Sequence, residues 1–399
     1  MIPAARVQAA IEILDLVIAA ARDGGPAADT LVARYFATRR YAGSKDRRAV
    51  RDLVYRAIRA AAERPDSGRA ALLNAASGDP DLLAAFDGSR HGPAPVAPGE
   101  IVEAGEAPAV PAWLIQRLDP CLAADEWPAL LGRAPLDLRV NRLQGTREQA
   151  MRALAEAVPT PLSPIGLRLP DGFRVEETGA WSSGLVEIQD EGSQLLGLAC
   201  AAKPGMAALD LCAGAGGKTL ALAAEMNDEG RLVASDTDRA RLSRMGPRLE
   251  RAGVTIVETR LLDPGREKEA LGGLAGAMDL VLVDAPCSGT GTWRRNPELR
   301  WRLNPERLRR FVEAQARLLD LAASFVRPGG ALVYAICSIL AEEGRGQAEA
   351  FSARSALVPE DIATPFAEDF GRAAGPGRLL SPRRDGTDGF FVARWRAPC

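Results

Sequence analysis

The chain has 399 residues, of which 47% are hydrophobic and 26% charged, and its formal charge is −2. This length accommodates two or three domains, and the composition is that of an ordinary globular protein rather than a disordered or membrane-embedded one. A charge so close to zero excludes overall basicity, so any affinity for nucleic acid must be local.

The cysteines and histidines give no sign of a metal site. The six cysteines contain no C-x-x-C pair, and His91 is the only histidine, which leaves no zinc constellation. No stretch is long and apolar enough to span a membrane, and the N-terminus lacks the pattern of a signal peptide. We therefore expect a monomeric cytoplasmic protein with reduced thiols, no metal and no membrane association.

The N-terminal third predicts helices. Apolar residues recur at helical spacing from residue 5 to about residue 75, and Ser44 is the expected N-cap of the helix that carries Val50. Residues 77–111 are rich in proline and predict an irregular connection, after which a helical pattern resumes over residues 113–131. We expect one helical domain over residues 1–132.

A basic cluster lies at the start of the helix that carries Val50. The simplest interpretation is a solvated helix end, and the alternative is a phosphate-binding face. The basic side chains concerned are Arg39, Arg40, Lys45, Arg47, Arg48 and Arg51.

A small α+β module is expected over residues 133–185. Leu136 to Asn141 alternates as a strand, and short strands are expected near residues 166–174. Between them, Thr146 and Gln149 have the spacing of a capping box at a helix start. The alternative to a functional module is a structural spacer.

A glycine-rich turn follows the strand predicted at residues 207–211. The turn consists of Cys212, Ala213, Gly214, Ala215, Gly216, Gly217 and Lys218. A nucleotide phosphate loop would need glycine where Cys212 stands, so an adenosyl or dinucleotide site fits better. Asp236, about 20 residues beyond the turn at the end of the next predicted strand, is placed to hold ribose hydroxyls. Asp263 follows a third strand, predicted at residues 254–258, and this order of elements is typical of a Rossmann-like α/β domain, expected over residues 186–399.

Two further predicted strands end at cysteines. The strand of residues 279–283 leads to Asp284 and Cys287, and the strand of residues 331–335 leads to Cys337. Ligands of parallel α/β sheets bind at the carboxyl ends of strands. A cysteine there often only fills space, but two beside an adenosyl-type loop favour thiolate chemistry.

A second group of arginines, interleaved with Trp293 and Trp301, follows the Cys287 loop. Such a pattern suits RNA phosphates and unstacked bases, although a charged helix face is as good an interpretation of the arginines alone. The group comprises Arg294, Arg295, Arg300, Arg302, Arg307, Arg309 and Arg310.

The stretches LDLCAGAGGKT, VDAPCSGTG and YAICS resemble the motifs of the Sun family of RNA (cytosine-5) methyltransferases, and most closely its bacterial 16S ribosomal RNA members. The resemblance extends from about Gln189 to the C-terminus. The N-terminal helices, with AGSKDRR, resemble the NusB-like RNA-binding domain of those members, and the middle module resembles their RRM-like domain.

The resemblance implies a class I methyltransferase that uses S-adenosyl-L-methionine. Cys337 would add to C6 of a cytosine, Asp284 would hydrogen-bond the base near N3, and Cys287 would assist proton removal and product release. Lys218 would face the reacting centre. The cofactor-binding residues would be the 212–218 loop, Asp236, Asp263 and Asp284. The RNA-binding residues would be Arg39, Arg40, Lys45, Arg47, Arg48, Arg294 and Arg295. The partner would be RNA, preferably ribosomal RNA and possibly in a small-subunit assembly intermediate.

Three positions depart from the family pattern. Ala215 replaces a frequent proline, and Ile336 replaces the threonine before the second cysteine. In the family, the acid after the third strand is implied to bind adenine and usually follows glycine directly, whereas residues 260–262 precede Asp263 here, which weakens the assignment of that role to Asp263.

Two classes of methyltransferase lack their motifs in this chain, and two alternatives stay open. A DNA cytosine-5 methyltransferase would use Cys287 as nucleophile, but the chain has no Glu-Asn-Val motif and Cys337 would have no role. An amino-methyltransferase would carry an Asp/Asn-Pro-Pro-aromatic loop, which is absent. A transfer-RNA methyltransferase of the same family is the nearest alternative, and a non-catalytic RNA-binding assembly factor is the other.

Overall fold

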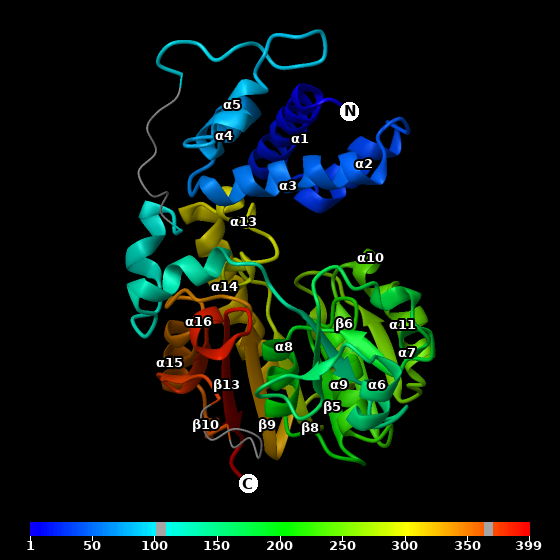
Figure 1. Ribbon diagram of the computed structural model, residues 1–399. Helices are drawn as coiled ribbons and strands as arrows, with labels where there is room; N and C mark the ends of the chain where they lie inside the picture. The colour runs from blue at the N-terminus through cyan, green and yellow to red at the C-terminus, as the bar shows by residue number, and fades with distance from the viewer. Residues whose placement is uncertain (101–108, 363–369) are drawn as a thin grey trace. The chain divides into compact units, whose positions relative to one another are not determined.

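The computed structural model describes residues 1–100, 109–362 and 370–399. Residues 101–108 of the expected 77–111 connection therefore lie outside the described part. The chain forms two compact units, coloured by residue number in Figure 1. The helical unit contains residues 1–117, 127–132 and 292–305, and the sheet unit contains residues 118–126, 133–291 and 306–399.

The helical unit is built around the long helix α1, which begins with a proline in its first turn and ends at Gly24 in the left-handed conformation, as helix ends often do. Buried residues of α1, α2, α3 and α4 form one hydrophobic core. The helices of residues 1–132 are α1 (Pro3–Asp23), α2 (Ala28–Ala37), α3 (Ser44–Ala60), α4 (Gly68–Ala75), α5 (Pro80–Ala84), η1 (Ala112–Arg117) and η2 (Ala124–Leu131).

Two local predictions in this region are wrong. Ser44 is the first residue of α3, and Gly43 stands at the N-cap without a side-chain hydrogen bond. Residues 113–131 do not form an α-helix but two 3-10 helices, η1 and η2. Pro120 and Pro128 explain the second difference, because proline has no N–H to continue an α-helical ladder.

The segment 292–305 completes the helical unit, although it lies far along the chain and follows the Cys287 loop directly. It carries the short helix α13 (Leu299–Arg302). The indole of Trp301 is 3% exposed within the core formed by α1 to α4, and its Nε1 donates to Ala61 O at 2.9 Å. Nothing in the apolar periodicity of residues 1–132 announces this insertion.

The sheet unit begins with a small four-stranded antiparallel sheet in the order β2-β3-β1-β4. The predicted capping box is confirmed, because the Thr146 and Gln149 side chains each accept from the other's backbone N–H at the start of α6. The fourth strand begins at Val186, one residue beyond the predicted end of the module. The elements are β1 (Leu136–Val140), α6 (Arg147–Ala153), β2 (Val158–Pro159), β3 (Gly166–Leu169), η3 (Val175–Glu177), α7 (Gly179–Ser182) and β4 (Val186–Ile188).

The large sheet has the order β11-β12-β13-β9-β8-β5-β6-β7, and β10 pairs with β13. The five strands β7, β6, β5, β8 and β9 are parallel neighbours, and β13 is antiparallel to β9. These pairings confirm the expected Rossmann-like α/β domain. The strands are β5 (Ala207–Asp210), β6 (Arg231–Asp236), β7 (Val257–Leu261), β8 (Met278–Asp284), β9 (Val326–Ile336), β10 (Val358–Pro359), β11 (Arg372–Ala374), β12 (Gly377–Leu380) and β13 (Phe390–Arg396).

Helices connect and cover the strands of the large sheet (Figure 1). Leucines, valines and alanines of β5, β8 and β9 pack with α8 and α9 in one buried cluster. The helices are α8 (Glu191–Ala199), α9 (Gly217–Glu225), α10 (Arg239–Leu242), α11 (Met245–Ala252), α12 (Glu267–Leu271), η4 (Gly272–Leu274), η5 (Thr290–Thr292), α14 (Pro305–Ala323), α15 (Arg345–Arg354) and α16 (Pro382–Asp385).

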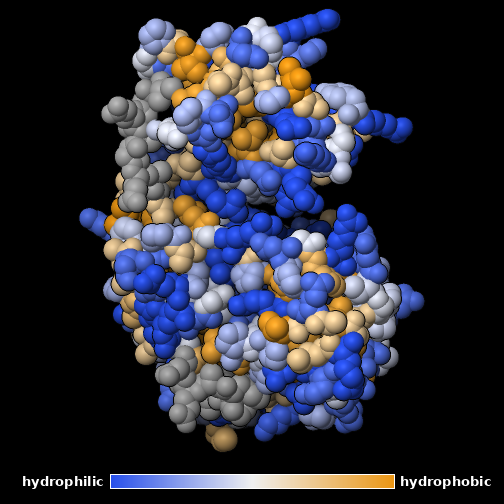
Figure 2. Space-filling model, viewed as in Figure 1, coloured by the Kyte–Doolittle hydropathy of each residue, from blue (hydrophilic) through white to orange (hydrophobic). Residues whose placement is uncertain are grey.

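Hydrophilic side chains make up much of the surface seen in Figure 2. Among the described residues, no helix combines the length and the apolar character that crossing a membrane requires.

Candidate active site

The glycine-rich loop connects β5 to the N-terminus of α9. Gly214 and Gly216 have φ angles of +56° and +88°, a conformation that side chains other than glycine seldom adopt. A Cβ at Gly216 would also meet Cγ of Met245 at 2.7 Å. Gly216 caps α9 without a side-chain hydrogen bond, so the N–H groups of the first turn are available to a polar or anionic ligand group.

Asp236 lies at the carboxyl end of β6, beside this loop. Its Oδ2 accepts from the N–H of Gly214 at 2.8 Å, and its Oδ1 accepts from the N–H of Asp238 at 2.7 Å. Asp263 is exposed on the loop after β7. Both carboxylates follow parallel strands of the same sheet, so both are at its ligand-binding edge.

Lys218 and Asp284 form an ion pair at the centre of this edge. The distance from Lys218 Nζ to Asp284 Oδ2 is 2.7 Å, and the lysine side chain is 9% exposed. Burial acts to lower the pKa of Lys218, but the Asp284 carboxylate outweighs that effect and the pKa is raised. Lys218 therefore stays charged and holds the Asp284 carboxylate in a fixed orientation.

The two predicted cysteines meet. Cys287 Sγ lies 3.4 Å from Cys337 Sγ, because β8 and β9 are parallel neighbours with Asp284 in register with Ala335. The hydrogen bond to Cys337 raises the pKa of Cys287 well above its ordinary value, and burial and the negative charges of Cys337 and Glu343 add to the effect. Either sulfur can be the donor of this contact.

Asp210, at the end of β5, is a site residue that the sequence reasoning missed. It is fully buried, and Thr219 Oγ1 donates to its Oδ2 at 2.7 Å, while its Oδ1 has no hydrogen-bond partner among the described residues. Burial, and secondarily the charge of Asp284, raise the pKa of Asp210 to about 7. Asp210 could have been identified from the sequence, because it is the last residue of the strand before the glycine-rich turn.

Arg248 on α11 was also missed. Its Nη1 donates to Ala215 O at 2.7 Å, and its Nη2 donates to Glu187 Oε2 at 3.0 Å. Glu187 belongs to β4 of the small module and is also bound by Arg251, whose guanidinium lies 3.5 Å from the centre of the Trp181 ring. The small module is thus tied through one arginine to the backbone of the glycine-rich loop.

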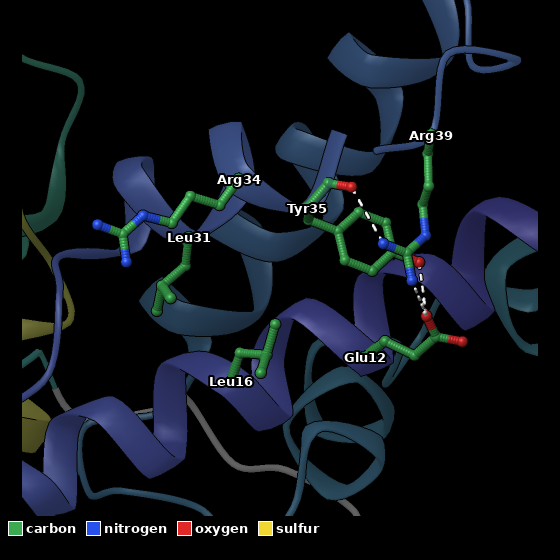
Figure 3. A pocket seen from close by; sticks show the side chains of 6 residues that line it. All are labelled: Glu12, Leu16, Leu31, Arg34, Tyr35 and Arg39. Carbon is green, nitrogen blue, oxygen red and sulfur yellow. Dashed lines mark hydrogen bonds and ion pairs between the residues drawn. The ribbon is translucent and has the colours of Figure 1, made fainter. Parts of the chain in front are cut away.

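Some side chains of the basic cluster near the start of α3 make contacts within the helical unit. Arg39 lies over the Tyr35 ring at 3.6 Å and pairs with Glu12 at 3.6 Å, at one end of a pocket between α1 and α2 (Figure 3). Arg47 is exposed, although its Nε donates to Ala42 O at 2.8 Å. The remaining exposed basic side chains of the cluster are Arg40, Lys45, Arg48 and Arg51, and RNA binding by this group stays a prediction.

The second arginine group is not one surface. Arg300 is 2% exposed and donates to Ile58 O at 2.6 Å, and burial, followed by the charge of Arg59, lowers the pKa of Arg300 to about 10. Arg302 donates to the carbonyls of Gly25 and Pro26. These two arginines hold the segment 292–305 within the helical unit. Arg294 is buried and Arg295 is half-buried, and contact with RNA by these two residues stays a prediction.

The described residues contain no group of three or more His, Cys, Asp or Glu side chains arranged to hold a metal ion.

Comparisons with known proteins show which families the chain resembles. A family model described as 16S rRNA methyltransferase RsmB/F matches residues 198–396, and an RsmF/B-like ferredoxin-like domain matches residues 110–176. Ribosomal RNA small subunit methyltransferase B of Salmonella newport (strain SL254) is 34% identical over 292 residues, which cover 71% of this chain and 65% of the relative. The match thus spans slightly less than two thirds of that relative's length.

Solved structures show the same fold. The crystal structure of PH0851 matches with a TM-score of 0.75 at 23% identity and covers 98% of each chain. A methyltransferase homolog protein from Pyrococcus horikoshii matches with a TM-score of 0.58 at 27% identity, over 69% of this chain and 90% of that one.

Proposed function

Because the chain belongs to the 16S rRNA methyltransferase RsmB/F family, we propose that it methylates carbon 5 of a cytosine in RNA, with S-adenosyl-L-methionine as the methyl donor. We propose 16S ribosomal RNA as its substrate. The observation that carries the proposal is the pair of thiols, Cys287 and Cys337, 3.4 Å apart beside the Lys218–Asp284 ion pair.

The residues at the sheet edge fit the cofactor. The free N–H groups at the start of α9 suit a carboxylate, and Asp236 suits ribose hydroxyls. A side chain at Gly217 would meet nothing within 4 Å, so there is room over the loop. The buried Oδ1 of Asp210 lacks a partner among the described residues, and the ammonium group of the cofactor could supply one. When S-adenosyl-L-methionine is bound at this loop, its sulfonium supplies an electrophilic methyl group.

The residues of the chain would prepare the base for that methyl group. The Cys337 thiolate adds to C6 of cytosine, and the electron pair of the C5–C6 double bond becomes available at C5. N3 of the adduct takes a proton from solvent and donates it in a hydrogen bond to Asp284, which Lys218 orients, and this proton returns to solvent when the product is released. The target base must leave its stack to reach these groups.

Cys287 would act in the second half of the reaction. Its raised pKa depends first on the interaction with Cys337, and that interaction ends once the Cys337 sulfur is bonded to C6. The pKa of Cys287 then falls, so that the thiol can release its proton to solvent and the resulting thiolate can take the C5 proton after methyl transfer. The electrons of the C5–H bond reform the C5–C6 double bond and expel Cys337 as thiolate. Cys337 would thus act first, as the nucleophile, and Cys287 second, as the base.

The test compares two cysteine variants with a radiolabelled methyl donor and 16S ribosomal RNA. Cys337→Ala should abolish methyl transfer, whereas Cys287→Ala should accumulate a covalent protein–RNA adduct that survives denaturing electrophoresis. An active Cys337→Ala variant together with an adduct-free Cys287→Ala variant would refute the mechanism. Bisulfite mapping of ribosomal and transfer RNA from a deletion strain identifies the substrate, and a lost site in transfer RNA would favour the alternative within the family.

A further inference from the structure

Glu343 is a buried carboxylate that the proposed reaction does not use. Its side chain is fully buried, and burying an ionised carboxylate is costly unless hydrogen bonds replace the lost water. Glu343 Oε1 accepts from Ser288 N at 2.8 Å and from Gln315 Nε2 at 3.0 Å. Glu343 Oε2 accepts from Ser338 Oγ at 2.5 Å and from Ser288 Oγ. All of these donors are uncharged, so hydrogen bonds from neutral groups, rather than an ion pair with any of these donors, hold the Glu343 side chain in place.

Three of the four donors, Ser288 N, Ser288 Oγ and Ser338 Oγ, belong to the two loops that carry the cysteines. Ser288 follows Cys287 directly, and Ser338 follows Cys337 directly. Thr290 Oγ1 lies 2.9 Å from Ser338 Oγ and accepts from Ile339 N at 3.1 Å, which adds a second link between the loops.

The network is anchored in the sheet unit on two further sides. Gln315 of α14 donates to Pro286 O at 3.0 Å as well as to Glu343. Tyr334 of β9 donates from its hydroxyl to Glu343 O at 2.8 Å. The carboxylate therefore has a fixed position, to which the residue after each cysteine is bonded.

We propose that Glu343 is a positioning residue that holds the Cys287 and Cys337 thiols at their contact distance through Ser288 and Ser338. The inference rests on the proposed function only for its effect on turnover, because the distance between the thiols is a property of the protein alone. A displacement of about 1 Å at reacting groups can lower a rate on the order of 100-fold, so a fixed separation matters for a reaction that uses both thiols in turn.

The first test measures thiol proximity without RNA or cofactor. Dibromobimane bridges two neighbouring thiols, and mass spectrometry of tryptic peptides quantifies the Cys287–Cys337 product. Glu343→Gln should slow bridging on the order of tenfold, because an amide offers one acceptor oxygen where the carboxylate offers two. Bridging at the wild-type rate in this variant would overturn the proposal.

Matched variants separate positioning from general damage. Glu349→Gln changes an exposed carboxylate on α15 and should bridge as the wild type does. If circular dichroism shows that Glu343→Gln does not fold, the variants Gln315→Met and Ser288→Ala test the proposal instead. Each removes one hydrogen-bond donor to Glu343 and leaves the carboxylate in place. Both should slow bridging, and wild-type rates in both would overturn the proposal.

The second test measures turnover. Glu343→Gln should lower kcat on the order of 10-fold to 100-fold and leave the KM for S-adenosyl-L-methionine unchanged, and Glu343→Asp should restore part of the loss. Wild-type kcat in Glu343→Gln would overturn the positioning role. Slow bridging in the variant, combined with no methyl transfer by the wild type, would instead refute the proposed function and leave the positioning role intact.

Discussion

Lys218 Nζ lies 2.7 Å from Asp284 Oδ2, and this ion pair connects the first turn of α9 to the end of β8. The lysine is buried and the carboxylate is one-third exposed, so the charge of Lys218 acts on a group that is open to a ligand. The pair therefore links the glycine-rich loop with the strand that leads to Cys287.

Replacing Lys218 by glutamine should lower methyl transfer on the order of 100-fold to 1000-fold, the range seen when an oriented polar group at a reacting centre is lost. Asp284 would lose the partner that orients it. Single-turnover assays with saturating RNA measure the effect. Lys203→Gln, at an exposed lysine of the same unit, is the matched control, and equal losses in the two variants would contradict the role of the ion pair.

Asp210 should make stability depend on pH. Burial raises its pKa from 3.8 to about 7, so the folded protein holds this proton more tightly than the unfolded chain does. The resulting stabilisation is complete below the ordinary pKa and is lost as pH rises through about 7. Asp210→Asn removes the titration. Between about pH 5 and about pH 8, the melting temperature of the wild type should therefore fall relative to that of the variant.

Asp171→Asn is the control for this measurement, because it changes an exposed carboxyl of the same unit. Its melting temperature should follow the wild-type pH dependence. A constant difference in melting temperature between the wild type and Asp210→Asn across the pH range would show that Asp210 does not titrate there.

The active-site edge of the sheet could be predicted from the sequence because its signals are local. Alternating apolar residues ending at Asp284, a glycine turn before α9 and cysteines at two strand ends each depend on a few neighbouring residues. The contacts that support them could not be predicted this way. Glu343 is bonded to Ser288, a partner 55 positions away, and only the parallel pairing of β8 with β9 brings the two together.

The role of the arginines after Trp293 also could not be predicted from the sequence. Their density suggested a nucleic-acid surface, yet Arg300 and Arg302 donate to backbone carbonyls of the helical unit. Composition alone does not distinguish a guanidinium that binds phosphate from one that satisfies carbonyls, since both roles use the same five donors.

Trp301 should be required for the stability of the helical unit. Its indole is buried among residues of α1 to α4, so Trp301→Ala would leave a cavity and an unsatisfied Ala61 carbonyl. The expected loss is about 3–5 kcal/mol, visible as a lower-temperature transition in calorimetry. Trp301→Phe keeps most of the volume and should lose less, and an unchanged transition in the alanine variant would exclude the core role.

The exposed basic residues of α3 should contribute to RNA affinity through phosphate contacts. The double variant Lys45→Gln, Arg48→Gln should weaken binding and reduce the slope of log affinity against log salt concentration by up to about 1.4 to 1.8, the range for two phosphate contacts. Filter binding over a series of salt concentrations measures both quantities. Arg152→Gln and Arg266→Gln remove the same charge from the sheet unit and serve as the control, and equal slopes in the two double variants would contradict the prediction.

Arg248 should set cofactor affinity rather than chemistry. Its guanidinium bonds Ala215 O at 2.7 Å and is itself held by the buried carboxylate of Glu187. Hydrogen bonds to charged groups contribute about 1.5–3 kcal/mol, so Arg248→Ala should weaken binding of S-adenosyl-L-methionine at least on the order of tenfold, because a freed loop must be ordered again on binding. Saturating cofactor should restore kcat, because neither thiol nor the Lys218–Asp284 pair is touched.

Isothermal titration calorimetry measures the affinity, with Arg244→Ala, at an exposed arginine directly before α11, as the matched control. Glu187→Gln should weaken cofactor binding in the same direction but less, because Arg248 keeps its bond to Ala215 and loses only the carboxylate that orients it. A defect in kcat with unchanged affinity in Arg248→Ala would show that this arginine acts on the reacting groups. Cofactor binding that weakens in both variants would show that the small module, through β4, helps to order the loop on which the cofactor lies.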